Sequence, residues 1–113
     1  MPREQWINWI WLLIAGAFEI SWIVALKESA GFSKPLATFG VIVLSAASLF
    51  ALSRAAQAIP IGIAYAVWTG IGAVGAIAVG IALYGEQLDG LRLVFLCMIV
   101  FAIVGLKLTS SAA

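Results

Sequence analysis

Glu19 is the one ionisable residue that lies well inside a long apolar stretch of this 113-residue chain. In a membrane, a carboxylate at the centre of a helix costs about 2.5–3.5 kcal/mol on insertion scales, so its presence indicates a functional group by default. Such a carboxyl can hold a proton or a monovalent cation, but not both. Its side chain is short, and Lys27 lies about 10 Å further along a helix, so Glu19 cannot easily reach water. The alternative is a structural role as an inert, protonated hydrogen-bonding group.

Aromatic and hydroxyl residues recur at helical spacing around this glutamate. Trp22 follows Glu19 by three residues and therefore shares its helix face, and Tyr65 and Trp68 share a face in the same way. An indole N–H inside a helix needs an acceptor, and Glu19 can accept one such bond. Tyr65 can supply another hydrogen bond to Glu19, and Ser48 can join them. We therefore predict that Trp22, Ser48, Tyr65 and Trp68 support a binding site at Glu19. Filling of the core is the alternative for the two tryptophans.

Three glycines follow Trp68 within a few residues: Gly70, Gly72 and Gly75. Small residues in a membrane helix permit a second helix to approach closely. They also make the helix easier to bend. Packing is the favoured interpretation, and flexing is the alternative.

Four apolar stretches must position these residues. Apolar residues make up 65% of the chain and charged residues 10%, with a mean hydropathy of +1.16, whereas soluble domains carry about 25% charged residues. Polar runs divide the chain into expected spans at 6–26, 35–52, 61–84 and 91–106. Open strands would leave backbone groups unpaired in hydrocarbon. The expected fold is therefore an all-α membrane protein, a single four-helix transmembrane domain over residues 1–113.

Composition also excludes several classes of protein. The chain has no histidine and a single cysteine. It therefore has few of the side chains that bind zinc or haem, and one cysteine cannot form an internal disulfide. The net charge of +1 supplies no basic surface for nucleic acid. We find no paired nucleophile and base and no ATP-binding motif. We therefore expect neither an enzyme nor a bound cofactor.

Three tryptophans cluster where the first span enters the membrane: Trp6, Trp9 and Trp11. Indole rings favour the headgroup level of a bilayer. These residues are expected to form an interfacial belt.

Positive residues are balanced between the two ends of the spans, although a bias near the helix ends normally sets orientation. The face that holds both termini carries Arg3, Arg54 and Lys107, and the opposite face carries Lys27, Lys34 and Arg92. This balance predicts either a weakly determined topology or insertion in both orientations, with copies that pair antiparallel. Four short helices fill their own centre, so a path for a solute favours a dimer.

Two stretches of the sequence resemble a known family of membrane transporters. Residues 60–73 read PIGIAYAVWTGIGA, and residues 18–22 read FEISW, followed by Leu26 and Lys27. With four spans and a glutamate in the first of them, the chain resembles the small multidrug resistance transporters over nearly its whole length. The FEISW stretch is similar to the guanidinium exporter subtype, whereas residues 86–89 resemble the quaternary-ammonium multidrug subtype.

The resemblance implies an antiparallel homodimer in the inner (plasma) membrane that exchanges protons for guanidinium ion and small substituted guanidinium cations. It implies that Glu19 of both subunits binds substrate or proton, surrounded by Trp22, Ser48, Tyr65 and Trp68. Broad export of quaternary ammonium and other lipophilic cations is the alternative within the family. A non-transporting membrane partner subunit is the alternative from another class.

Overall fold

The computed structural model describes residues 3–109, with side chains from Trp6 onward, and this part of the chain forms four helices. They are α1 (Arg3–Glu28), α2 (Pro35–Ala55), α3 (Ile61–Tyr84) and α4 (Gly90–Thr109). Each helix is long and apolar enough to cross a membrane, and no strand occurs within residues 3–109. These findings confirm the all-helical membrane fold. The chain is a multi-pass membrane protein.

Backbone chemistry explains where α3 ends and α4 begins. After α3, Gly85 adopts a φ of +64° and the Glu86 N–H donates a 3.0 Å hydrogen bond to the Gly80 carbonyl. This left-handed turn favours glycine, which carries no Cβ to clash. At the start of α4, the Asp89 carboxylate accepts a 2.8 Å hydrogen bond from the Arg92 N–H. A carboxylate in this position satisfies a helix donor that has no partner within the helix.

Three helices extend past the ends expected at residues 26, 52 and 106. They continue to Glu28, Ala55 and Thr109. The added turn of α2 contains Ser53 and Arg54, which lie beyond the span expected at residues 35–52. Polar side chains at a membrane surface are solvated by water and headgroups, so they do not interrupt the backbone hydrogen bonds of a helix.

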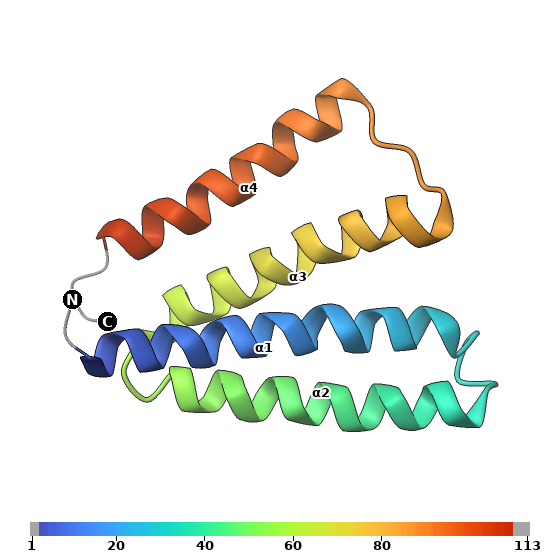
Figure 1. Ribbon diagram of the computed structural model, residues 1–113, viewed down its shortest axis with the longest axis horizontal. Helices are drawn as coiled ribbons and strands as arrows, with labels where there is room; N and C mark the ends of the chain where they lie inside the picture. The colour runs from blue at the N-terminus through green and yellow to red at the C-terminus, as the bar shows by residue number, and fades with distance from the viewer. Residues whose placement is uncertain (1–2, 110–113) are drawn as a thin grey trace.

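Figure 1 shows α1 lying between α2 and α3, while α4 leans away on the far side of α3. Near its end, α4 returns to the beginning of α1. There the Lys107 Nζ lies 4.7 Å from the ring centroid of Trp6 and 5.3 Å from that of Trp9. The first three helices therefore form the packed body of the described chain, and α4 forms an arm along one side.

Glycine lets α1 and α3 approach closely along one line, which we call the α1–α3 seam. A Cβ added at the seam glycines would overlap a side chain of the facing helix. The contacts pair Gly16 with Ile71, Glu19 with Gly72 and Ile20 with Gly75. Residue numbers rise together on the two helices, so α1 and α3 run in the same direction. The seam can thus bring successive positions of both helices to one site.

Gly70 plays a similar part between α3 and α4. A Cβ at Gly70 would come within 2.6 Å of the Ile103 side chain. Gly70, Gly72 and Gly75 therefore all pack against neighbouring helices in this structure. A role for them in bending α3 stays a prediction, since α3 runs as one continuous helix from Ile61 to Tyr84.

The body of the protein is held by small and medium apolar side chains, among them the fully buried Leu12 and Ala15 of α1. Trp9 also lies in this core, with 4% of its surface exposed, compared with 51% for Trp6. The interfacial belt expected at Trp6, Trp9 and Trp11 is therefore wrong for Trp9. The reason is helical periodicity, which places Trp9 on the face of α1 that Leu12 and Ala15 turn toward the neighbouring helices.

Replacing Gly75 with valine should lower the free energy of unfolding by about 1–3 kcal/mol, because overpacking would displace Ile20 in the seam. The control is Gly62→Ala, at a position of α3 where a Cβ meets open space, and it should leave stability nearly unchanged. Unfolding by SDS titration in mixed micelles measures both. Equal stability of the two variants would contradict the packing role of Gly75.

Candidate functional site

Glu19 lies in the α1–α3 seam with 9% of its surface exposed. Its Oε1 accepts a 2.5 Å hydrogen bond from the indole Nε1–H of Trp22, which lies one turn later on α1. Across the seam, Gly72 packs against the Glu19 side chain, and a Cβ at Gly72 would overlap the Glu19 Cγ. The glycine therefore leaves room for the carboxyl, and the indole supplies one of the polar partners that a buried carboxylate requires.

A second hydrogen-bonded unit joins α1, α2 and α3. The hydroxyl of Ser48 on α2 is fully buried and donates a 2.7 Å hydrogen bond to the Ala15 carbonyl of α1. The same hydroxyl accepts a 2.8 Å hydrogen bond from the Trp68 Nε1–H of α3. Ala15 precedes Glu19 by four residues, so the two units lie on one face of α1. Ser48 thus links Trp68 of α3 to the backbone of α1 one turn before Glu19.

Tyr65 lies at the open edge of this arrangement, with 56% of its surface exposed. Its ring packs against Trp68, with the centroids 5.6 Å apart and the planes tilted by 46°. The sequence suggested that Tyr65 supplies a hydrogen bond to Glu19. In this structure the Tyr65 ring instead contacts the Trp68 ring, and Trp68 in turn donates its hydrogen bond to Ser48. Tyr65 can therefore offer an aromatic face to a ligand that enters from this edge.

These groups together suit a small organic cation or a proton. A carboxylate has about four acceptor positions, and Trp22 occupies one of those of Glu19. The nearby indole rings add electron-rich faces that attract cations. Within residues 3–109, no group of three His, Cys, Asp or Glu side chains is placed to hold a metal ion. The chemistry of this site is therefore that of a lone carboxyl among aromatic rings.

Four polar residues meet at the far end of the seam, and the sequence did not indicate that they would. We call Lys27, Glu28, Tyr84 and Glu86 the end cluster. Lys27 Nζ lies 3.1 Å from Glu86 Oε2 and 4.3 Å from the centroid of the Tyr84 ring. The Tyr84 hydroxyl donates a hydrogen bond to Glu28. Polar residues follow both apolar spans, but their meeting could be predicted only if α1 and α3 were known to run side by side in one direction.

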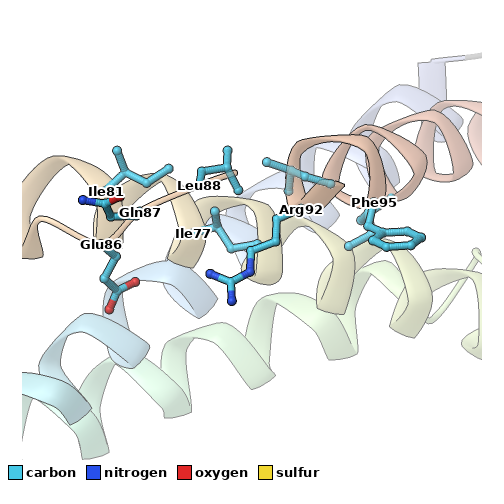
Figure 2. A pocket seen from close by; sticks show the side chains of 9 residues that line it. Ile77, Ile81, Glu86, Gln87, Leu88, Arg92 and Phe95 are labelled. Atoms are coloured by element: carbon cyan, nitrogen blue, oxygen red, sulfur yellow. The ribbon is translucent and has the colours of Figure 1, made fainter. Parts of the chain in front are cut away.

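A cavity of about 330 Å³ lies beside the end cluster, between α3, α4 and the loop that joins them. Figure 2 shows its apolar wall, which includes Ile77 and Ile81, and shows the Glu86 carboxylate pointing away from that wall toward α1. Ile77 and Ile81 lie on the face of α3 roughly opposite to Gly72. The cavity is therefore separate from the Glu19 site.

Four membrane-spanning helices, with one buried, indole-bonded carboxyl between α1 and α3, define a small polytopic membrane protein of the transporter class. The family model described as "Small Multidrug Resistance protein" matches residues 7–99. The chain belongs to the small multidrug resistance family. This membership confirms the resemblance read from residues 18–22 and 60–73.

Curated relatives named "Guanidinium exporter" match the chain along nearly their full length. The relative from Escherichia coli (strain K12) is 45% identical over 104 residues, which cover 92% of this chain and 99% of the relative. The relative from Yersinia pestis is 48% identical over 102 residues, covering 90% and 98%. The relative from Salmonella typhimurium (strain LT2) is 47% identical over 104 residues, covering 92% and 99%. Together with the four spans, these matches place the protein in the inner membrane.

Ser48→Ala should destabilise the fold by about 1–3 kcal/mol, because it leaves the partly buried Trp68 N–H without its acceptor. The matched control on α2 is Ser45→Ala, whose hydroxyl donates only to the Ile42 carbonyl of its own helix at 3.2 Å. SDS titration gives the free energies, and tryptophan fluorescence reports the change around Trp68. A loss no greater than that of the control would show that the Ser48–Trp68 bond contributes little.

Proposed function

We propose that this protein is a proton-coupled antiporter that exports guanidinium ion and small substituted guanidinium cations. The observation that carries the proposal is Glu19, a carboxyl buried between α1 and α3 with the indole N–H of Trp22 on one oxygen. The relatives named for guanidinium export support the substrate class. Their similarity covers the helices that build the Glu19 site.

The substrate matches the site in shape and charge. Guanidinium is planar and presents pairs of N–H groups that fit the two oxygens of a carboxylate. The rings of Trp22 and Trp68 can stack on its plane, and Tyr65 offers a further face at the exposed edge. A cation bound in this way is held by charge, hydrogen bonds and stacking at once.

Exchange follows when two cations use one carboxyl. A proton on Glu19 removes both the negative charge and the pair of acceptors that guanidinium needs. Bound guanidinium in turn occupies the place where the proton would sit. The two cations therefore cross the membrane alternately, and a proton gradient supplies the energy for export.

We further propose that two copies pair antiparallel, so that both Glu19 side chains serve one shared cavity. Helix α4 supports pairing, because none of its residues is buried in the described chain. It exposes large apolar side chains, including 55% of Phe95, 59% of Met98 and 81% of Phe101. The even balance of positive residues on the two faces supports the antiparallel arrangement.

Glu19→Gln keeps the shape of the side chain but cannot ionise, so guanidinium binding and proton-driven exchange should both be lost. Glu19→Asp should retain part of the exchange, since the carboxylate survives at a shorter reach. The control is Asp89→Asn, which removes a loop carboxylate and keeps a side chain able to cap α4. Uptake of guanidinium into liposomes that hold the purified protein, driven by a proton gradient, measures all three.

Protons should also compete with guanidinium for the wild-type protein, because protonated Glu19 offers no counter-charge. Tight, pH-dependent binding by Glu19→Gln would place the site elsewhere. Equal uptake of a quaternary ammonium ion would favour the multidrug alternative. A wild-type protein that takes up none of these cations would favour a non-transporting subunit.

Two lysines added to the loop at residues 56–60 should fix one orientation, because positive residues hold a loop on the cytoplasmic side. Exchange by that variant expressed alone should then fall. Single cysteines in the loops at 29–34 and 56–60, in a Cys97→Ser background, report orientation by labelling from outside the cell. If the wild type already inserts in a single uniform orientation, the antiparallel pair is excluded.

A further inference from the structure

Beyond Glu19, the α1–α3 seam opens into a groove of about 190 Å³. Side chains of both helices line it, including Ile23 of α1 and Ala76 of α3. Ile23 lies one helical turn after Glu19, and Ala76 lies one turn after Gly72, which packs against Glu19. The groove therefore begins one turn from the carboxyl and runs toward the ends of both helices.

The end cluster lies at the outer end of this groove, which we call its mouth. Lys27, Tyr84 and Glu86 line the groove at that end. Lys27 Nζ reaches across the seam to within 3.1 Å of Glu86 Oε2 and lies 4.3 Å from the Tyr84 ring centroid. The Tyr84 hydroxyl adds a second link by donating to Glu28. Both links join the end of α1 to the end of α3 and the loop that follows it.

The Lys27–Glu86 ion pair at the mouth is weak enough to break readily. The Lys27 and Glu86 side chains are 52% and 53% exposed, and exposed ion pairs are weak and screened by salt. The Glu86 carboxylate lies over Gly80, where a Cβ would overlap its Oε1. Gly80 therefore provides the space that lets Glu86 reach Lys27.

We propose that the Lys27–Glu86 pair, backed by Tyr84 and Glu28, is a gate on the path between water and Glu19. When the pair is closed, the Lys27 ammonium fills the mouth and repels an arriving cation. When the pair opens, a guanidinium-type cation can take the place of the Lys27 ammonium. It can then pair with the Glu86 carboxylate and lie over the Tyr84 ring. The identity of this passing cation rests on the proposed function, whereas the opening and closing of the groove do not.

Labelling of a cysteine in the groove tests the gate without any transport. Ala76→Cys in a Cys97→Ser background leaves a single thiol, because Cys97 is the only cysteine of the chain. Its rate of reaction with a water-soluble cationic thiosulfonate, in detergent-solubilised protein, reports how often the groove opens. Lys27→Met and Glu86→Gln should each raise that rate about two- to fivefold, the range expected for loss of an exposed ion pair.

The two substitutions also separate gating from simple attraction of the reagent. Removing the positive charge of Lys27 would attract a cationic reagent, whereas removing the negative charge of Glu86 would repel it. Faster labelling in both variants therefore requires opening of the groove. Asp89→Asn is the matched control, because it breaks an exposed 3.8 Å ion pair with Arg92 at the same end of the molecule. Its labelling rate should equal that of the parent protein.

Gly80→Ala tests the gate by shape alone. The new methyl group should push the Glu86 carboxylate away from Lys27 and raise the labelling rate with no change in charge. High salt should raise the rate of the parent protein and leave that of Lys27→Met unchanged.

Labelling rates that are the same in the parent, Lys27→Met and Gly80→Ala would overturn the gate. Guanidinium uptake by the same set of proteins separates this failure from that of the proposed function. Faster labelling without uptake by any protein would support the gate and reject the substrate. Uptake by the parent with unchanged labelling would support the function and reject the gate.

Discussion

The burial of one carboxyl group between two parallel helices is the constraint on which the rest of this structure depends. A carboxylate in the apolar interior of a membrane protein needs both room and polar partners. Gly72 provides the room, and the Trp22 indole, one turn away on the same helix, provides a partner. Small residues along the seam follow from the same need, because α1 and α3 must lie close together for the carboxyl to be enclosed. The position that is costly for folding is therefore also the one that we propose as the cation site.

The seam serves stability and access at the same time. Its tightly packed part, where Gly16 meets Ile71 and Gly75 meets Ile20, holds α1 against α3. Its looser part, one turn beyond Glu19, becomes a groove that ends at exposed charged residues. Helix α2 holds α1 and α3 together through Ser48, which bonds to the Ala15 carbonyl of α1 and to the Trp68 indole of α3. Glu19 therefore lies between the tightly packed part of the seam and the groove. This position suits a site that is exposed to water only part of the time.

Helix α4 stands apart from this body in both its packing and its chemistry. It approaches α3 at Gly70 and Ile103 and reaches α1 through Lys107, which lies over the Trp6 and Trp9 rings. Its remaining apolar surface is turned outward, where lipid or a second copy can cover it. The three-helix body therefore carries the Glu19 site, and α4 adds an exposed apolar surface beside it.

Much of the molecule followed from properties that are local along the chain. Apolar runs of the right length predicted four helices, and helical spacing predicted that Trp22 shares a face with Glu19, because both depend on residues close in sequence. Helix ends were predicted less well, since polar residues at a membrane surface leave the backbone bonds of a helix intact. The burial of Trp9, the Trp68–Ser48 bond and the Lys27–Glu86 pair could not be predicted in this way. Each joins residues from different helices, so it depends on which helices are neighbours, in which direction they run and how closely glycine lets them approach.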